Sequence, residues 1–376
     1  MYEDNNFSYS YVVSINFYLF HFIYKKYLYK TENIIRAMSS SSDSDINELL
    51  SSIVTYAYQY FGIFLYIIGN FGNLLTLWIF SKKSWRRKVC VFYFFLCLIS
   101  NTIFINSVFI GAILIHGFNI NILIYNPFLC KIYFYVAYVL SICYPMILIL
   151  ATIDRLLISS QNVDTRLYSS KRLAYFSSCI CMFLWLIFSI HILIKVNIHE
   201  IYPTYFFCYY DLYDIQYQLF NLYTLLIITV VIFFSMIILS ILSFKNVRLI
   251  KPIPRQQRHR TRSMSRKDFQ LLRSLYVHNI AYNVWTALTV GGLCFDTVLA
   301  HKIPTDFERI LQLFLGNMGG LLHYVPFCTS FFIFISISRS FRQELKCIIY
   351  QIIRKDVRMI RDEDMPEHEL PATTNN

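Results

Sequence analysis

Seven apolar stretches, each longer than 20 residues, restrict the fold of this 376-residue chain more than any other feature. About 20 apolar residues in a row suffice for a helix to cross the hydrocarbon of a bilayer. Because lipid offers no partners to free backbone groups, each crossing segment is expected to be a helix. The sequence therefore predicts an all-α membrane protein, a seven-transmembrane helix bundle. The stretches are Ile53–Phe80, Val89–Ile115, Pro127–Ile158, Leu173–Ile194, Phe220–Phe244, Leu271–Ala300 and Ile310–Ile337.

The Lys and Arg residues between these stretches favour one orientation. The segments on one side hold 26 of them, whereas those on the other side hold four. Cytoplasmic loops of membrane proteins carry an excess of basic residues. We therefore expect a plasma-membrane protein with its N-terminus outside and its C-terminus in the cytoplasm. The basic segments are Ser81–Lys88, Arg155–Arg172, Lys245–Arg273 and Arg339–Arg361, and the four opposite residues are Lys131, Lys195, Lys302 and Arg309.

Composition narrows the function classes. The net charge of +12 follows from the basic cytoplasmic segments, which face anionic lipid, so nucleic-acid binding is not expected. The sequence has no His-Glu-x-x-His motif and its nine histidines lack metal-ligand spacing, so we expect no enzyme, no metal and no cofactor. Transporters and channels usually carry intramembrane acids or inverted repeats. Neither is apparent in this sequence, which makes that class a less favoured alternative.

Several motifs occur in the order typical of one receptor family. The first stretch contains Gly72-Asn73-Leu74-Leu75, the third runs from Cys130 to Asp154-Arg155-Leu156, and the fourth contains Trp185. With these residues the chain resembles a divergent member of the rhodopsin-like (class A) G-protein-coupled receptors. The resemblance implies a receptor that transmits extracellular ligand binding to a cytoplasmic heterotrimeric G protein. The main alternative is a receptor-like protein that does not couple.

The resemblance implies a disulfide and a charged latch. Cys130 is similar to the family's cysteine at the outer end of the third helix, and its implied partner is Cys208 in the second outer loop. In Asp154-Arg155-Leu156, the arginine is implied to pair at rest with Asp154 and with Asp268 at the foot of the sixth helix. An unpaired charge at this depth is costly, so such a pairing can act as a latch.

Three further residues are implied to pack helices together: Asn73, Asn101 and Trp185. A buried amide in a membrane forms hydrogen bonds between helices, and a neighbouring glycine permits close approach. Asn70 competes with Asn73 for the family's position, but Asn73 fits better because Leu74-Leu75 follow it. Asn101 replaces the family's buried acid, so we expect no modulation by sodium.

The sixth and seventh stretches depart most from the family pattern. Trp285 is present without the family's proline, and Gly291-Gly292 is expected to supply flexibility instead. The family's Asn-Pro-x-x-Tyr is replaced by a segment that includes Ser330, Phe331 and Phe334. The usual switch in the seventh helix is therefore expected to be altered.

The chain is expected to have three parts. Residues 1–52 form an extracellular N-terminus, residues 53–337 the transmembrane domain, and residues 338–376 a cytoplasmic helix and tail. Met38 is an alternative start, in which case residues 1–37 are a gene-model extension. Ser338–Leu345 resembles the family's short amphipathic eighth helix on the inner membrane face.

The ligand is constrained mainly by exclusion. Ala137 occupies the position at which the family's amine receptors carry an acid, so an amine is not expected. The stretch Ile310–Ile337 contains no lysine, which excludes a retinal attachment. The acidic loop Asp211–Asp214 slightly favours a peptide ligand. Candidate ligand contacts, which are equally typical of an aromatic belt or of packing, are Tyr133, Tyr138, Trp285 and His323.

Overall fold

The computed structural model describes residues 41–86, 88–160, 165, 168–202, 205–211, 214–249, 266–299 and 306–363. The expectation about residues 1–37 therefore lies outside the described residues. In chain order, the elements are α2 (Ser41–Tyr56), η1 (Ala57–Gly62), α3 (Ile63–Ser81), α4 (Lys83–Arg86), α5 (Val89–Phe104), η2 (Ile105–Phe109), α6 (Ile110–Ala112), η3 (Ile113–Gly117), η4 (Ile122–Ile124), α7 (Pro127–Ser159), α9 (Lys171–Phe188), α10 (Ile190–Lys195), β1 (Val196–Tyr202), β2 (Tyr205–Tyr210), α11 (Ile215–Leu249), α12 (Arg266–Leu299), α13 (Asp306–His323), α14 (Val325–Cys328), α15 (Ser330–Ile337) and α16 (Arg339–Glu363).

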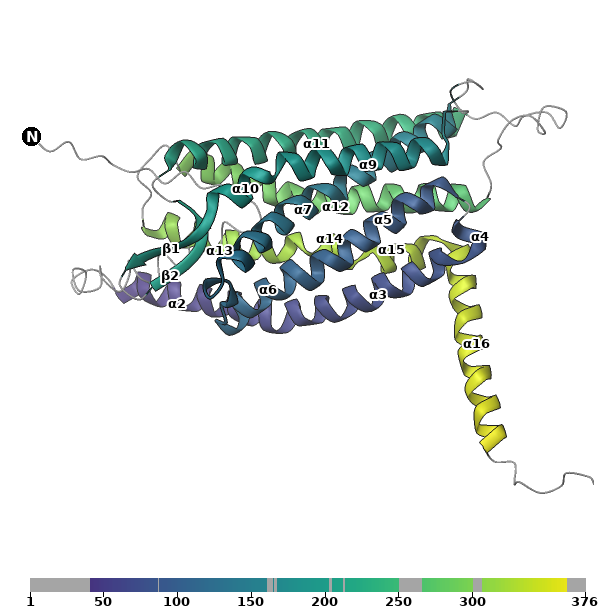
Figure 1. Cartoon of the computed structure of the whole chain (residues 1–376), viewed down its shortest axis with the longest axis horizontal. Coiled ribbons are helices and arrows are strands. Elements are labelled where there is room, and N and C mark those ends of the chain that lie inside the picture. The colour runs from purple at the N-terminus through teal and green to yellow at the C-terminus, as the bar shows by residue number, and fades with distance from the viewer. Residues whose placement is uncertain are drawn as a thin grey trace, which may run out of the picture.

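The long helices form an elongated bundle (Figure 1). Within the described residues, five helical spans are long and apolar enough to cross a membrane, and a bent pair, Ile310–Cys328 with Ser330–Ile337, makes a sixth if it counts as one span. The 34-residue helix α12 also runs along the bundle, but it is more polar. The chain is therefore a multi-pass membrane protein. The five spans are Ile46–Ser81, Val89–Gly117, Pro127–Ser159, Lys171–Lys195 and Leu219–Asn246.

Helix α7 is the centre of the bundle. In its most apolar window 67% of the residues are buried, against 17% for the span that contains α9. Helices α5, α9, α11 and α12 all pack against α7. Pro145 lies inside α7, which continues through it to Ser159. A central helix touching most of the others is well placed to link the two ends of the molecule.

The last span is broken near its middle. Helix α13 ends at His323, α14 is only four residues long, and α15 follows at an angle of 46° to the preceding segment. Pro326 explains the break, because its ring removes a backbone donor from the helical ladder. The break leaves carbonyl groups that other residues must satisfy.

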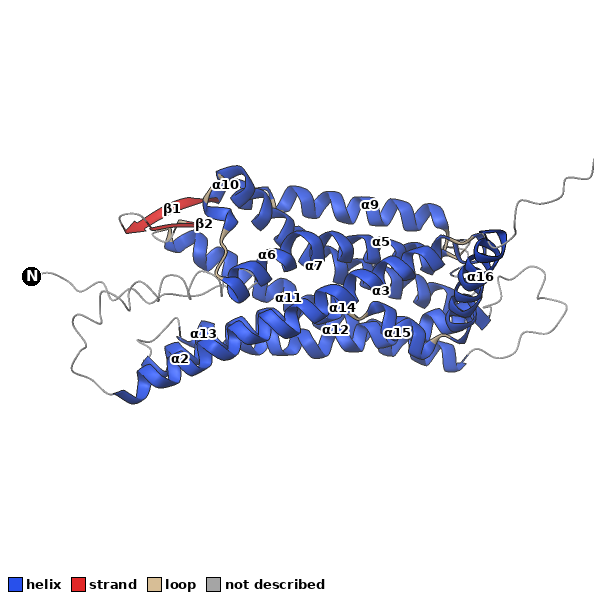
Figure 2. Cartoon of the chain, turned by 90° about the horizontal axis from the view of Figure 1, so that it is seen from below, coloured by secondary structure: helices blue, strands red, loops and turns tan. Residues whose placement is uncertain are grey.

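A two-stranded hairpin interrupts the helical architecture, which was expected to be all-α. Strands β1 and β2 pair antiparallel, with Val196 opposite Tyr210 and a bulge between Glu200 and Tyr202. Both strands are rich in β-branched and aromatic residues, which favour extended structure. The hairpin lies at one end of the bundle, whereas α4 and α16 lie at the other (Figure 2). These ends are called below the disulfide end and the α16 end.

Helix α16 differs from the short helix expected at Ser338–Leu345. It has 25 residues and leaves the bundle steeply (Figure 1). The sequence contains neither Gly nor Pro from Ser338 to Met365, so nothing in it ends the helix earlier. Phe341 and Ile348 are buried against the bundle. A salt bridge of 2.9 Å between Lys82 and Glu344 also holds its first turns.

Candidate functional site

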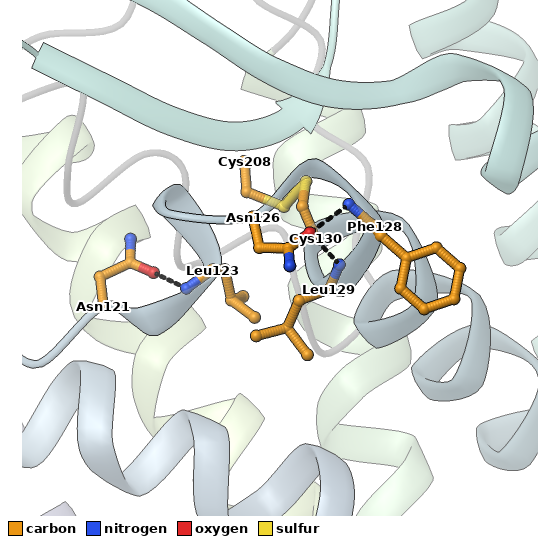
Figure 3. Close-up of a disulfide and its surroundings, with 7 residues drawn as sticks. All are labelled: Asn121, Leu123, Asn126, Phe128, Leu129, Cys130 and Cys208. Atoms are coloured by element: carbon orange, nitrogen blue, oxygen red, sulfur yellow. Dashed lines mark hydrogen bonds between the residues drawn. A yellow bond between two sulfur atoms is a disulfide. The ribbon is translucent and has the colours of Figure 1, made fainter.

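A disulfide joins the start of α7 to strand β2 (Figure 3). The Cα atoms of Cys130 and Cys208 are 5.7 Å apart, and both residues are buried. Seventy-eight residues separate them in sequence. The expected bridge is thus confirmed. It fixes the hairpin to the first turn of the central helix.

The start of α7 is set by local sequence. Asn126 precedes Pro127, which is favoured in the first turn of a helix. The Asn126 Oδ1 atom accepts hydrogen bonds from the backbone N–H groups of Phe128 at 2.9 Å and Leu129 at 3.3 Å (Figure 3). Asn121 caps the preceding short helix η4 in the same way. These caps hold Cys130 in place for the bridge to the hairpin.

At the α16 end, α7 carries a buried ion pair. Arg155 is 1% exposed and Asp154 is 4% exposed. The Arg155 Nε group donates to Asp154 Oδ2 at 3.0 Å, and its Nη2 group donates to the same oxygen. The Ser169 hydroxyl donates to the other oxygen, Oδ1, at 2.6 Å. Both carboxylate oxygens are therefore occupied, as a buried charge requires. The adjacent Leu156 is half-buried.

Asp268, in the first turn of α12, lies close to two cations. The Lys88 Nζ atom is 2.8 Å from Asp268 Oδ2, whereas Arg155 Nη1 is 3.9 Å from Asp268 Oδ1. The longer distance exceeds that of a hydrogen bond. The structure therefore brings Asp268 near Arg155, as the family pattern implies, but gives it a shorter contact with Lys88.

Two residues further along α12, Gln270 bonds to the junction of α15 and α16. Its Oε1 atom accepts hydrogen bonds from the Ser338 hydroxyl at 3.2 Å and from the Ser340 N–H group at 3.1 Å. The Ser338 hydroxyl oxygen also accepts from the N–H group of Phe341 and thereby caps α16. The end of α12 is thus attached to both α5 and the start of α16.

Buried amides connect the helices in the middle of the bundle. Asn73 is fully buried, and its Nδ2 group donates to the Phe327 carbonyl at 3.1 Å. Asn70, the competing residue, is half-buried: it donates to the Tyr66 carbonyl one turn away in its own helix, and its Oδ1 atom accepts from the Nδ2 group of the exposed Asn106. The Asn101 Nδ2 group lies 3.4 Å from the Ser330 hydroxyl. Because an amide is neutral, Asn101 carries no negative charge to offset that of a cation.

Aromatic packing surrounds the altered seventh-helix segment. The Phe334 ring is 1% exposed and packs 4.9 Å from each of the rings of Phe80, Phe94 and His278. These residues belong to α3, α5 and α12. Phe331 lies close to Gly72, where a methyl group would come within 2.7 Å of the Phe331 Cβ atom. Phe334, which has no hydroxyl group, thus occupies an aromatic cluster that includes the His278 ring.

Two tyrosines at the disulfide end differ in their hydroxyl contacts. Tyr133 is buried, and its hydroxyl donates to the Val108 carbonyl at 3.1 Å. Tyr138 is equally buried, but its hydroxyl makes no hydrogen bond among the described residues. The Tyr138 ring lies 5.7 Å from the ring of His191, whose Nδ1 atom is 2.8 Å from the Tyr217 hydroxyl. Tyr133 therefore joins helices, whereas Tyr138 keeps hydrogen-bonding capacity.

The remaining ligand candidates lie in mixed surroundings. His323 is half-buried beside Phe327 and Phe104, with ring distances of 5.4 and 6.4 Å. Trp285 is half-buried and packs against the core. Asp214 pairs with Lys195 at 2.7 Å, and this hydrogen bond together with that from the Tyr217 N–H group lowers the pKa of Asp214. This acid therefore already has a cationic partner.

Trp185 lies on the outer side of the bundle, in α9. It is half-buried, and its ring lies 5.4 Å from that of Phe188. Both line an open apolar groove to which α7 contributes Met146. The position fits the helix-packing role expected for Trp185, with α7 as a neighbour.

Some residues of these sites were not singled out from sequence. Lys88 is the last residue of a basic segment, and Gln270 and Ser169 are common polar residues beside helix ends. The sequence around each of these residues does not indicate its hydrogen-bond partner, because the contacts depend on how helices far apart in the sequence pack together. His191 lies within the apolar stretch Leu173–Ile194, and that placement is the one sequence signal by which it could have been found.

Residues 72–341 match the family model described as 7 transmembrane receptor (rhodopsin family). The matched segment contains the disulfide, the Arg155 ion pair, α12 and the start of α16. No curated protein matches the chain in a direct sequence comparison. Because the family model covers more than half of the chain, the chain belongs to the rhodopsin family of seven-transmembrane receptors.

Proposed function

We propose that the chain is a signalling receptor that passes ligand binding at its disulfide end to a heterotrimeric G protein at its α16 end. The observation that carries the proposal is the buried pair of Arg155 and Asp154, at the end of the central helix opposite the disulfide. Twenty-five helical residues from Cys130 to Arg155 span about 37 Å. One helix therefore links the two sides of a bilayer.

The orientation and the helix count are part of the proposal. The α16 end carries most of the Lys and Arg residues, so it faces the cytoplasm. Helix α12 completes a bundle of seven transmembrane helices, and buried polar residues of α12 bond to other helices. For example, Asn279 Nδ2 donates to the Thr152 and Ser240 hydroxyls, each at 3.0 Å. α16, which is amphipathic and basic, lies on the inner membrane face as the eighth helix.

The proposed switch is a displacement of α12. At rest, Arg155 lies on Asp154 and faces Asp268. An activating ligand binds better to a state in which the end of α12 has moved outward, and so shifts the population toward it. Arg155 then turns toward a cleft that receives the Gα subunit. The burial of Arg155 supports this latch, because a charge 1% exposed changes partners only if its surroundings move.

We propose a peptide as the ligand class. Among the described residues at the disulfide end, the Tyr138 hydroxyl and Asn221 Oδ1 are buried polar atoms without a hydrogen-bond partner, and both belong to neutral groups. A peptide backbone offers both donors and acceptors to such groups.

The test is G-protein activation in cells, measured with a panel of Gα subunits and a library of peptides. We compare wild type with Arg155→Ala and Asp154→Asn at matched surface expression. Arg155→Ala is expected to abolish a ligand-evoked signal, and Asp154→Asn to raise basal activity. Arg172→Ala removes an exposed arginine at the same end and serves as the control. Surface-expressed protein that stays silent, with all variants equal, would contradict coupling.

A non-coupling receptor-like protein is the second candidate. It is favoured by the seventh-helix segment, in which Phe334 replaces the family's tyrosine and lies among apolar rings. In that case ligand binding to membranes persists while no Gα subunit responds.

A further inference from the structure

We infer that Lys88, rather than Arg155, is the residue that holds Asp268 and thereby keeps the end of α12 closed. The inference rests on the proposed function and names the regulation of the same site. It assigns a positioning role to Lys88 and, through a second contact, to Gln270.

The distances at Asp268 favour Lys88. Its ammonium group is 2.8 Å from Asp268 Oδ2, a charge-assisted hydrogen bond, whereas the nearest Arg155 nitrogen is 3.9 Å from Oδ1. The Arg155 Nε and Nη2 groups already donate to Asp154. The remaining Nη1 group makes no hydrogen bond among the described residues. Arg155 is therefore committed to its own helix, and its attraction for Asp268 is a longer-range one.

The helix ends explain why Lys88 and Asp268 attract each other. Lys88 is the N-cap residue of α5, where the positive end of the helix dipole disfavours a cation. Asp268 lies in the first turn of α12, where the dipole favours an acid. A carboxylate from α12 beside Lys88 compensates the positive start of α5 as well as the lysine charge.

The backbone at Lys88 is anchored to the core of the bundle. The Lys88 N–H group donates to the Trp85 carbonyl at 3.0 Å, and Trp85 is 1% exposed. The Trp85 ring packs 5.4 Å from Phe80 in α3. Lys88 therefore extends from a turn anchored in the core, and its ion pair ties α12 to the α3–α5 side of the bundle.

Gln270 provides a second attachment on another neighbour. Its contacts with Ser338 and Ser340 join α12 to the start of α16. By contrast, the hydrogen bonds from Asn279 to Thr152 of α7 and Ser240 of α11 lie nine residues, about 14 Å, further along α12 than Gln270. The end of α12 can swing outward about that region only if the contacts of Asp268 and Gln270 break.

The test measures the position of α12 directly, in full-length protein in nanodiscs without ligand or G protein. Spin labels are placed at Arg172→Cys in α9 and Arg273→Cys in α12, two exposed positions, and the distance between them is measured. The exposed cysteines Cys179 and Cys347 are first replaced by serine. Lys88→Met and Asp268→Asn are each expected to increase the population with a longer distance about fivefold. Gln270→Ala is expected to act in the same direction.

Two variants make the comparison specific. Lys82→Met breaks a salt bridge of similar length and exposure, 2.9 Å to Glu344, which does not involve α12. It is expected to leave the distances unchanged. Lys88→Arg keeps a cation facing Asp268 and is expected to retain the closed population that Lys88→Met loses.

A wild-type distance distribution for Lys88→Met would overturn the inference, and so would an increase for Arg155→Gln larger than that for Lys88→Met. This readout needs no coupling partner. Altered distances in a protein that activates no G protein would therefore remove the proposed coupling and leave the role of Lys88 intact. If the receptor activates a G protein but Lys88→Met changes neither the label distance nor the basal signal, the role of Lys88 is contradicted and the proposed coupling stands.

Discussion

The side-chain amide of Asn73 donates a hydrogen bond to the backbone carbonyl of Phe327, which lies 254 residues later in the chain. Phe327 belongs to the four-residue helix α14, at the break produced around Pro326. A carbonyl at a helix break inside a membrane needs a partner from outside its own ladder. Asn73 therefore couples the first span to the break in the last.

Replacing Asn73 by leucine is expected to lower the stability of the receptor by about 1 kcal/mol, because a buried carbonyl loses its partner. The measurement is the thermal unfolding midpoint in nanodiscs, with Asn70→Leu as the matched control. Asn70 is half-buried, and its partners are the Tyr66 carbonyl one turn away and the exposed side chain of Asn106, so its loss leaves no carbonyl at a helix break without a partner and should cost less. Equal shifts for the two variants would argue against the role given to Asn73.

The bridge between Cys130 and Cys208 closes a loop with a separation of 78 residues. We expect Cys130→Ser and Cys208→Ser to lower stability by the same amount, toward the lower end of the range of about 2 to 5 kcal/mol for native disulfides. The lower end applies because the unfolded reference keeps its helices inserted in the membrane.

The disulfide prediction is checked by unfolding in nanodiscs and by surface expression. The double variant should match either single variant, because both remove one bond. Cys347→Ser, which removes an exposed free thiol, should have no effect. A double variant with the summed loss would contradict the prediction.

Features of the fold and of the site could be predicted when they depend on local sequence, and could not when they depend on contacts between residues far apart in the chain. Hydropathy located the five spans and the bent pair that are long and apolar enough to cross a membrane, and the family pattern indicated the Cys130–Cys208 bridge, because these features depend on composition and on a few fixed positions. The hairpin was missed because Val196–Tyr210 lies between apolar stretches, where no helix was sought, although its residues favour strands. The length of α16 was underestimated because the family pattern suggested a short helix, whereas the sequence itself contains no helix breaker until Pro366.

The partner of Asp268 was the least predictable feature. Its expected pairing with Arg155 came from the resemblance, while the contact with Lys88 joins residues 180 positions apart. Both cations occur in basic segments rich in similar residues. Only the packing of α5 against α12 determines which of them is closer.

Gly72 and Gly291 provide a matched pair for testing close packing. A methyl group at Gly72 would come 2.7 Å from the Phe331 Cβ atom, whereas a methyl group at Gly291 would meet no atom of the described residues within 4 Å. Gly72→Ala is therefore expected to destabilise the receptor, and Gly291→Ala to stabilise it by up to about 1 kcal/mol through helix propensity.

The glycine pair is compared by thermal unfolding and by ligand-evoked signalling. If Gly291 supplies the flexibility that the missing proline would give to α12, then Gly291→Ala should also reduce the maximal signal. A stabilised variant with an unchanged signal would remove that role from Gly291. A stabilised Gly72→Ala would contradict the close approach of α3 and α15.

Removing the hydroxyl groups of Tyr133 and Tyr138 one at a time distinguishes a role in packing from a role in ligand recognition. Tyr133→Phe removes a buried hydrogen bond to the Val108 carbonyl, so it is expected to lower stability by about 1 kcal/mol and to leave ligand potency unchanged once surface expression is matched. Tyr138→Phe removes a buried hydroxyl that has no partner among the described residues, so it should be neutral or slightly stabilising. If that hydroxyl bonds to the ligand, Tyr138→Phe should reduce potency about tenfold, which corresponds to one lost hydrogen bond. Dose–response curves and unfolding midpoints for both variants decide the matter. If only Tyr133→Phe reduced ligand potency, the two roles would be exchanged. The Tyr133 hydroxyl, rather than that of Tyr138, would then be the group that the ligand recognises.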